Sequence, residues 1–152
     1  MSRGNLVGLN FDGVVVRRTA TLDVLGMPEV VGCRKTIRQL IHRGLEVVLV
    51  TSREGQELEV AERFMKIFQF PTKLVGIGRS CDISRRISTA DMSVYVSDQT
   101  NDLIPLKGIV QNLLWFSPPT MVPSAISSFV KRAGSHHELL TELSRCLPHK
   151  YK

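Results

Sequence analysis

Three short apolar runs, each followed at once by polar residues, constrain the fold of this chain most strongly. They end at Asn10, Thr51 and Ser97. The run at residues 45–50 is nearly continuous in apolar residues, which is typical of a strand in a parallel sheet that is covered on both faces. After the first run, Asn10 and Asp12 are two positions apart and would point to the same side of a strand, and Gly13 permits a tight turn. The sequence therefore predicts buried strands that carry polar groups at their carboxyl ends.

Helices and further strands are predicted between and after these runs. Pro28 is typical of the first turn of a helix and Gly44 of the position just after one, while residues 14–27 are expected to be irregular or a hairpin. The predicted strands cover residues 6–10, 45–50, 73–77, 93–96 and 109–116. The predicted helices cover residues 28–43, 55–69, 80–89, 120–133 and 135–146, with a short helical turn at 102–107. This alternation indicates an α/β fold with a mainly parallel five-stranded sheet and helices on both faces.

The composition restricts the class of protein and its compartment. The chain has 152 residues, of which 43% are apolar and 22% charged, as in soluble globular proteins. No apolar stretch approaches the roughly 20 residues that span a bilayer, so no membrane association is expected. The three cysteines are far apart and form neither a metal motif nor a disulfide framework. A cytoplasmic location, or another reducing intracellular compartment, is the simplest interpretation.

The net charge of +6 is compatible with nucleic acid, phosphorylated substrates or anionic surfaces and does not choose among them. One predicted helix has a basic face, which comprises Arg34, Lys35, Arg38 and His42. This face lacks interleaved aromatic residues, so a solvated helix surface is a better interpretation than a nucleic-acid site. A basic module that associates with nucleic acid remains an alternative.

The polar groups at the strand ends predict a shared site. Because the carboxyl ends of parallel strands lie at one edge of a sheet, Asp12, Thr51 and Asp98 should converge there. Carboxylates together with a backbone carbonyl suit Mg²⁺, which prefers oxygen ligands. The Thr51 hydroxyl and the backbone N–H groups at Thr51 and Ser52 suit a phosphate oxygen, whose charge a nearby cation such as Arg53 would neutralise.

At this point the sequence resembles the haloacid dehalogenase (HAD) superfamily, most of whose members are phosphatases. The resemblance rests on three motifs in order, which resemble the superfamily's motifs I, II and IV: Asn10-x-Asp12-Gly13, Thr51 after an apolar strand, and Ser97-Asp98-x-x-x-Asp102. It implies a Rossmann-like sheet with strand order 5-4-1-2-3, in which residues 14–27 form the squiggle and flap. It also implies one domain over residues 1–152 without a cap, whose open site would take a large substrate or use a partner subunit as its lid.

Residue roles follow from the resemblance. Asp12 would be the general acid/base, and its backbone carbonyl would also bind Mg²⁺. Thr51 would hold the transferring phosphoryl group, with Gly13 among the residues around the substrate. Asp98 would bind the metal directly or through water, and Asp102 would support it.

The basic residue of motif III is less clearly marked. Arg79, Lys73 and Arg85 compete for this catalytic position, and Arg79 is preferred because it directly precedes a predicted helix. Ser52 and Arg53 complete the predicted substrate contacts.

Asn10 departs from the family pattern. The resemblance places an aspartate at this position in the family, and that aspartate attacks phosphorus and forms a phospho-aspartate. The residue at this position would also be a metal ligand. An amide is a very poor nucleophile and removes one negative charge from the metal site. Three explanations stay open: a natural pseudoenzyme that binds a phosphorylated ligand or a protein partner, a phosphohydrolase whose natural residue 10 is Asp, or an enzyme that uses Asp12 differently. A homo-oligomer is a further expectation for the assembly.

Overall fold

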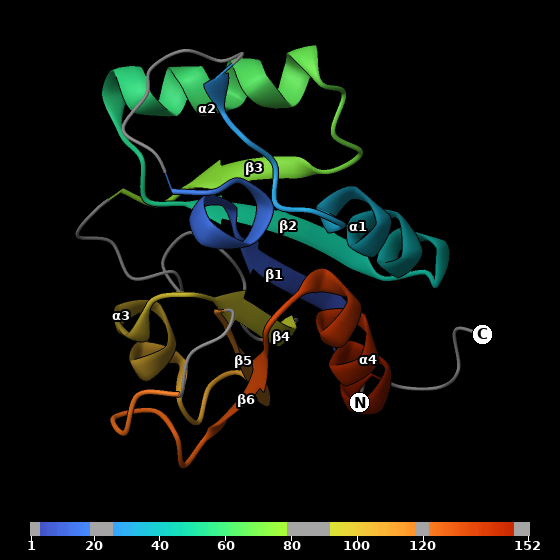
Figure 1. The fold of residues 1–152 in the computed structure, drawn as a ribbon, viewed down its shortest axis with the longest axis vertical. Coiled ribbons are helices and arrows are strands. Elements are labelled where there is room, and N and C mark those ends of the chain that lie inside the picture. The colour runs from blue at the N-terminus through green and yellow to red at the C-terminus, as the bar shows by residue number, and fades with distance from the viewer. Residues whose placement is uncertain (1–3, 19–25, 79–91, 118–121, 148–152) are drawn as a thin grey trace.

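A computed structural model describes residues 4–18, 26–78, 92–117 and 122–147 of the chain, and its centre is a six-stranded sheet (Figure 1). The strands are β1 (Leu6–Asn10), β2 (Glu46–Thr51), β3 (Lys73–Gly76), β4 (Met92–Ser97), β5 (Asn112–Phe116) and β6 (Val130–Ala133). Their order is β3-β2-β1-β4-β5-β6, and every neighbouring pair is parallel. The predicted Rossmann-like α/β class and the order of the first five strands are confirmed.

The sixth strand corrects the sequence-based prediction. Residues 120–133 were expected to form a helix, but residues 124–129 form turns and β6 pairs with β5 from Leu113↔Val130 to Phe116↔Ala133. The apolar residues of this segment do have helical spacing. However, β5 would otherwise be an edge strand with unpaired backbone groups, and pairing with β6 satisfies them.

Four α-helices accompany the sheet in the part of the chain that the structure describes. They are α1 (Cys33–His42), α2 (Gly55–Ile67), α3 (Thr100–Leu103, followed by a 3-10 turn at Ile104–Leu106) and α4 (His136–Cys146). The helices predicted near α2 and α4 and the short turn near α3 are confirmed, whereas the helix predicted at 80–89 lies outside the described residues. Ser135 caps α4, because its side chain accepts a hydrogen bond from the Glu138 N–H at 3.2 Å.

The predicted start of the first helix at Pro28 was wrong. The Pro28 carbonyl accepts from the Arg17 N–H at 2.8 Å, and the Val30 N–H donates to the Val15 carbonyl at 2.8 Å. These residues therefore pair antiparallel with the chain that follows β1, and α1 begins only after Gly32, whose φ is +88°. The predicted stop at Gly44 is confirmed by a φ of +86°.

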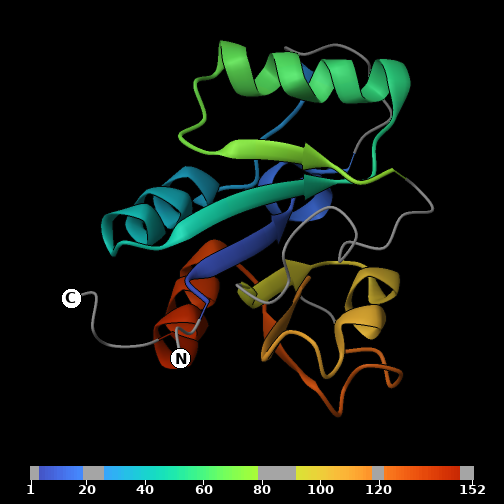
Figure 2. The same cartoon turned by 180° about the vertical axis from the view of Figure 1, so that it is seen from behind.

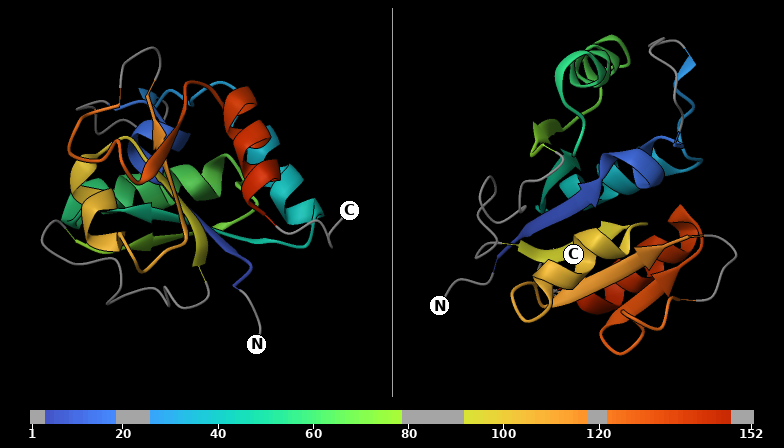
Figure 3. Two further views of the ribbon diagram at one scale, coloured as in Figure 1. Left: turned by 90° about the horizontal axis from the view of Figure 1, so that it is seen from below. Right: turned by 90° about the vertical axis from the view of Figure 1, so that its left-hand side faces the viewer.

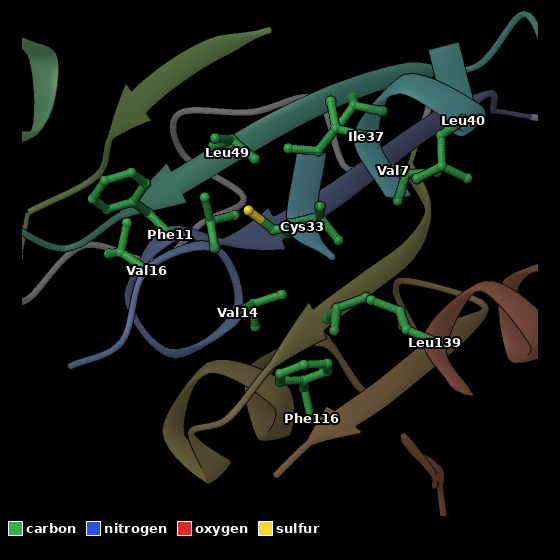
Figure 4. Close-up of a cluster of buried hydrophobic side chains, with 14 of the residues drawn as sticks. Val7, Phe11, Val14, Val16, Cys33, Ile37, Leu40, Leu49, Phe116 and Leu139 are labelled. Atoms are coloured by element: carbon green, nitrogen blue, oxygen red, sulfur yellow. The ribbon is translucent and has the colours of Figure 1, made fainter. Parts of the chain in front are cut away.

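Alternate residues of the strands serve two separate apolar cores. Val7 and Leu9 of β1 face a core that includes residues of α1, α2 and α4, among them Ile37, Leu40 and Leu139 (Figure 4). The other face of the sheet packs against the α3 region through Leu103 and Leu106. Figures 2 and 3 show α1 beside α4, with α3 on the opposite side. Burial on both faces explains why a central strand such as β2 is nearly continuous in apolar residues.

No helix in the described ranges combines the length and the apolar character that crossing a membrane requires.

Candidate functional site

The carboxyl ends of β1, β2 and β4 form the edge at which the predicted site residues meet. Asn10, Thr51 and Ser97 are the last residues of these three strands, and β1 lies between β2 and β4 in the sheet. Since the strands are parallel, these three ends and the residues just after them share one edge. The predicted convergence of polar side chains is therefore present in the structure.

A five-residue turn, η1 (Phe11–Val15), follows β1 and carries Asp12, and the backbone angles at Asp12 and Gly13 within it are not helical. The turn closes when the Val16 N–H donates to the Phe11 carbonyl at 3.0 Å, and Gly13 within it has a φ of +95°. His136 of α4 fixes the turn from behind, with its Nε2 at 2.7 Å from the Val14 carbonyl oxygen. The position of Asp12 is thus set by the sheet on one side and by α4 on the other.

Asn10 is buried, with 7% of its surface exposed. Its amide nitrogen Nδ2 donates to the backbone carbonyl of Asp12 at 2.8 Å. An aspartate could not make this contact in its charged form, because a carboxylate has no proton to donate. Asn10 therefore stabilises the turn after β1 with its amide group.

Asp12 and Arg53 form a bidentate ion pair. Arg53 Nε lies 2.9 Å from Asp12 Oδ2 and Arg53 Nη2 lies 2.7 Å from Asp12 Oδ1. The two side chains are only 7% and 15% exposed. The hydrogen bonds to Asp12 raise the pKa of Arg53 above its usual value, against the effect of burial. Both carboxylate oxygens of Asp12 are thus engaged by one guanidinium.

Asp98 forms a second bidentate pair, with Arg18. Arg18 Nε lies 2.9 Å from Asp98 Oδ2, and Arg18 Nη2 lies 2.7 Å from Asp98 Oδ1 and 3.3 Å from the Asp12 carbonyl oxygen. Gly13 lies directly against this pair, because a Cβ on Gly13 would come within 2.1 Å of Asp98 Oδ2. Glycine is required here both by the positive φ and by this close approach.

Thr51, Ser52 and Asp102 occupy less central positions. The fully buried Thr51 accepts a hydrogen bond from the Arg53 N–H at its Oγ1, at 3.1 Å, and so shapes the turn after β2. Ser52 is exposed. Asp102 Oδ2 accepts from Ser97 Oγ at 2.7 Å, and burial raises the pKa of Asp102 above its usual value. Thr51 and Asp102 therefore support the edge of the sheet around the two ion pairs.

The donor set does not suit Mg²⁺ in this arrangement. Both oxygens of Asp98 accept from Arg18, and the Asp12 carbonyl accepts from Arg18 and Asn10. Asn10 presents its nitrogen, not its oxygen, at this point, whereas Mg²⁺ requires oxygen ligands. Within the ranges that the structure describes, no group of three or more His, Cys, Asp or Glu side chains is placed to hold a metal ion.

Of the residues considered for motif III, only Lys73 is described. It is exposed at the start of β3, whereas the candidate site lies at the other end of the strands. Arg79 and Arg85 lie outside the described residues. Sequence reasoning assigned no role to Arg18, which the structure places against two of the predicted metal-binding groups, the Asp98 carboxylate and the Asp12 carbonyl. The only sequence signal was a basic residue shortly after the apolar segment that follows Gly13.

A pocket of about 470 Å³ opens beside Arg18 and Asp98. The turn after β1, residues 30–31 and the two residues just before α4 line it, with Phe116 among its apolar residues. The pocket gives the site an apolar wall next to a neutralised pair of charges. Arg18 and Asp98 line this pocket, whereas Asp12 does not.

Comparison with known proteins gives a result only at the level of structure. No family model matches the sequence, and no curated protein matches it. Solved structures do match, but their sequence identities to this chain are low, so the matches show similarity of fold alone.

Three of these structures illustrate the similarity. A D,D-heptose 1,7-bisphosphate phosphatase from B. bronchiseptica, complexed with magnesium and phosphate, has a TM-score of 0.64 and 15% identity over 92% of this chain and 98% of its own. A HAD-superfamily hydrolase from Ehrlichia chaffeensis has a TM-score of 0.65 and 7% identity over 97% and 100%. The cobalt-bound deoxy-D-mannose-octulosonate 8-phosphate phosphatase from Haemophilus influenzae has a TM-score of 0.61 and 14% identity over 95% and 89%. The resemblance seen in the sequence motifs is thus confirmed in three dimensions: the chain has the fold of the HAD superfamily.

Proposed function

We propose that the protein is a binding or regulatory module, a HAD-like domain whose phosphatase site is degenerate and does not hydrolyse phosphoesters efficiently. The single observation that carries this proposal is Asn10, which stands where the fold's nucleophilic aspartate would be. Its buried amide donates to the Asp12 carbonyl. Losing a covalent nucleophile typically costs several orders of magnitude in rate.

The pairing of Asp12 supports the same proposal. A general acid/base must direct a carboxyl oxygen toward the reacting group. Both oxygens of Asp12 instead accept hydrogen bonds from Arg53. In this arrangement the proposed acid/base and a proposed phosphate contact satisfy each other.

The ligand of this module is proposed to carry a phosphoryl group or to be a protein partner. Thr51, Ser52 and Arg53 lie at the end of β2, on the edge where the predicted site residues meet, and the B. bronchiseptica phosphatase, which has a similar fold, was solved with magnesium and phosphate. Weak affinity for Mg²⁺ belongs to the same proposal, because Asn10 contributes no charge. Self-association would provide a lid for an open site of this kind.

A reducing compartment, such as the cytoplasm, is proposed as the location. Cys33 and Cys146, the two cysteines in the described part of the chain, are both free. Burial raises the pKa of the Cys33 thiol to about 12, so it stays protonated and unreactive.

Hydrolysis of p-nitrophenyl phosphate with Mg²⁺ tests the proposal. The wild-type protein should turn over substrate no faster than background. Mg²⁺-dependent turnover that Asp12→Ala abolishes would overturn the proposal.

Two variants distinguish the alternative, a phosphohydrolase whose natural residue 10 is Asp. Asn10→Asp restores a nucleophile, and the alternative expects it to create activity, whereas a degenerate site stays inert. Asn5→Asp is the matched control, because it adds the same charge just before β1, at the opposite end of the strand. Activity in Asn10→Asp, but not in Asn5→Asp, would favour the phosphohydrolase.

A further inference from the structure

Arg18 contacts two of the groups that a HAD-type metal site would need. Its guanidinium makes two hydrogen bonds to the Asp98 carboxylate, at 2.9 and 2.7 Å, and one to the Asp12 carbonyl at 3.3 Å. A divalent cation at this edge would need the same oxygens. One cationic side chain therefore already bridges the end of β1 and the end of β4.

The charges at this edge are balanced in pairs without a metal. Asp12 is paired with Arg53, and Asp98 is paired with Arg18. The hydrogen bonds to Asp98 raise the pKa of Arg18, while the charge of Arg18 acts against that of Arg53. The two guanidinium groups are thus close enough to repel each other. A divalent cation added here would meet two positive charges and no unpaired carboxylate at Asp12 or Asp98.

The backbone delivers Arg18 to this position. The Arg17 N–H donates to the Pro28 carbonyl at 2.8 Å, and the turn before it closes between Gly13 and Val16 at 2.7 Å. Gly13 leaves room for the Asp98 carboxylate, which a Cβ would displace. The pairing of Arg18 with Asp98 is therefore built into the turn after β1. Arg18 itself remains 46% exposed, so its side chain can be replaced without opening the core.

We propose that the Arg18 guanidinium is a tethered cation that takes the place of the divalent metal ion at this site, so that the protein keeps its folded site without Mg²⁺. The inference rests on the weak Mg²⁺ affinity of the proposed function and goes beyond it, because it names the side chain that takes the place of the metal. With Asn10 in place of an aspartate, the site has one negative charge fewer. The single positive charge of the Arg18 guanidinium balances the remaining charge, whereas the two charges of Mg²⁺ would leave an excess of positive charge. The arginine also supplies directional hydrogen bonds that a bidentate carboxylate contact requires.

Metal binding by the wild type and three variants tests the proposal. Binding of Mg²⁺ is measured by isothermal titration calorimetry, and of Mn²⁺ by electron paramagnetic resonance, in each full-length protein. Arg18→Ala removes the tethered cation, and Arg18→Gln removes its charge while keeping a side chain of similar length. Arg17→Ala is the matched control, because it removes an exposed arginine one residue away. Circular dichroism confirms that each variant is folded.

The expected result is weak or undetectable binding by the wild type and by Arg17→Ala. Arg18→Ala and Arg18→Gln should bind on the order of tenfold more tightly, because the metal no longer competes with charge-assisted hydrogen bonds to Asp98. Wild-type binding as tight as that of the Arg18 variants would overturn the proposal, as would an equal gain in Arg17→Ala. An Arg18 variant that folds but gains no affinity would overturn it as well. Turnover of a phosphoester without added Mg²⁺ would contradict the proposed function alone and leave this inference standing, whereas Mg²⁺-dependent turnover would contradict both.

Discussion

The guanidinium of Arg53 holds the carboxylate of Asp12 through two nearly parallel hydrogen bonds, at 2.9 and 2.7 Å. These residues come from the turns after two neighbouring strands, β1 and β2. The sequence assigned them separate roles, Asp12 as general acid/base and Arg53 as a phosphate contact. Because the two side chains are paired, Asp12 can act as a general acid/base, or Arg53 can bind phosphate, only if the ion pair between them breaks inside a largely buried site.

The first prediction concerns this pair. Arg53→Ala should lower the free energy of unfolding by about 2–4 kcal/mol, because it leaves the Asp12 carboxylate without its partner. Urea denaturation measures the change. Ser52→Ala, at the exposed neighbouring position, should change the free energy of unfolding by less than about 0.5 kcal/mol.

A double-mutant cycle separates the pair from simple loss of side-chain packing. If Asp12→Ala and Arg53→Ala interact as the geometry indicates, the double variant should lose less stability than the sum of the single variants. Strictly additive losses would show that the ion pair contributes nothing measurable in solution.

The second prediction concerns Gly13. Gly13→Ala should destabilise the fold by about 2–4 kcal/mol, because alanine resists a φ of +95° and its Cβ would overlap the Asp98 carboxylate. Gly108 has a φ of +81° and no atom within 4 Å of a built Cβ, so Gly108→Ala carries the backbone cost alone, about 1–2 kcal/mol. Thermal unfolding of the two variants gives the difference. Equal losses would mean that Asp98 moves aside without cost.

The sequence predicted the sheet well because the strands are buried on both faces. Apolar runs such as 45–50 leave few alternatives, and polar residues directly after them mark the functional edge. β6 was missed because its pairing depends on the free edge of β5, a long-range feature that local spacing does not carry. The same holds for the segment at Pro28, whose backbone pairs with residues 15–17 instead of starting a helix.

The site was predicted as a set of residues but not as a set of contacts. Asn10, Asp12, Thr51 and Asp98 follow strands in register, so their convergence could be inferred from topology. Arg18 lies in a segment without periodicity, and its contact with Asp98 spans 80 positions in the chain. Nothing local in the sequence distinguishes it from Arg17, which lines the same pocket.

The third prediction concerns Gly8 in the middle of β1. A Cβ at this position would lie 2.6 Å from Cδ1 of the fully buried Tyr95 and 2.9 Å from Cε of Met92. Gly8→Ala should therefore cost about 1–3 kcal/mol through overpacking. Gly76→Ala is the control, because its Cβ would meet the methyl groups of Leu58 at 3.1 and 3.3 Å, where a flexible side chain can yield. Chemical denaturation that ranks the two variants the other way would contradict this account of the core.

The last prediction concerns His136, which joins α4 to α1 and to the turn after β1. Its Nε2 lies 2.7 Å from the Val14 carbonyl and must carry the proton, and its Nδ1, 2.9 Å from Thr36 Oγ1, then accepts. Burial lowers the pKa of His136 below its usual value of 6.5. Since the folded state favours the neutral ring, the stabilisation is complete above the unfolded-state pKa and is lost as the pH falls through the lower pKa of the folded state. Between about pH 7.5 and pH 5, the wild type should therefore lose more stability than His136→Gln, which cannot titrate in this range. His137→Gln, at the exposed neighbouring position, should follow the wild type, and urea midpoints across the pH series measure all three proteins. A wild-type midpoint that falls in parallel with that of His136→Gln would show that protonation of this ring does not weaken the contact between α4 and the turn that carries Asp12.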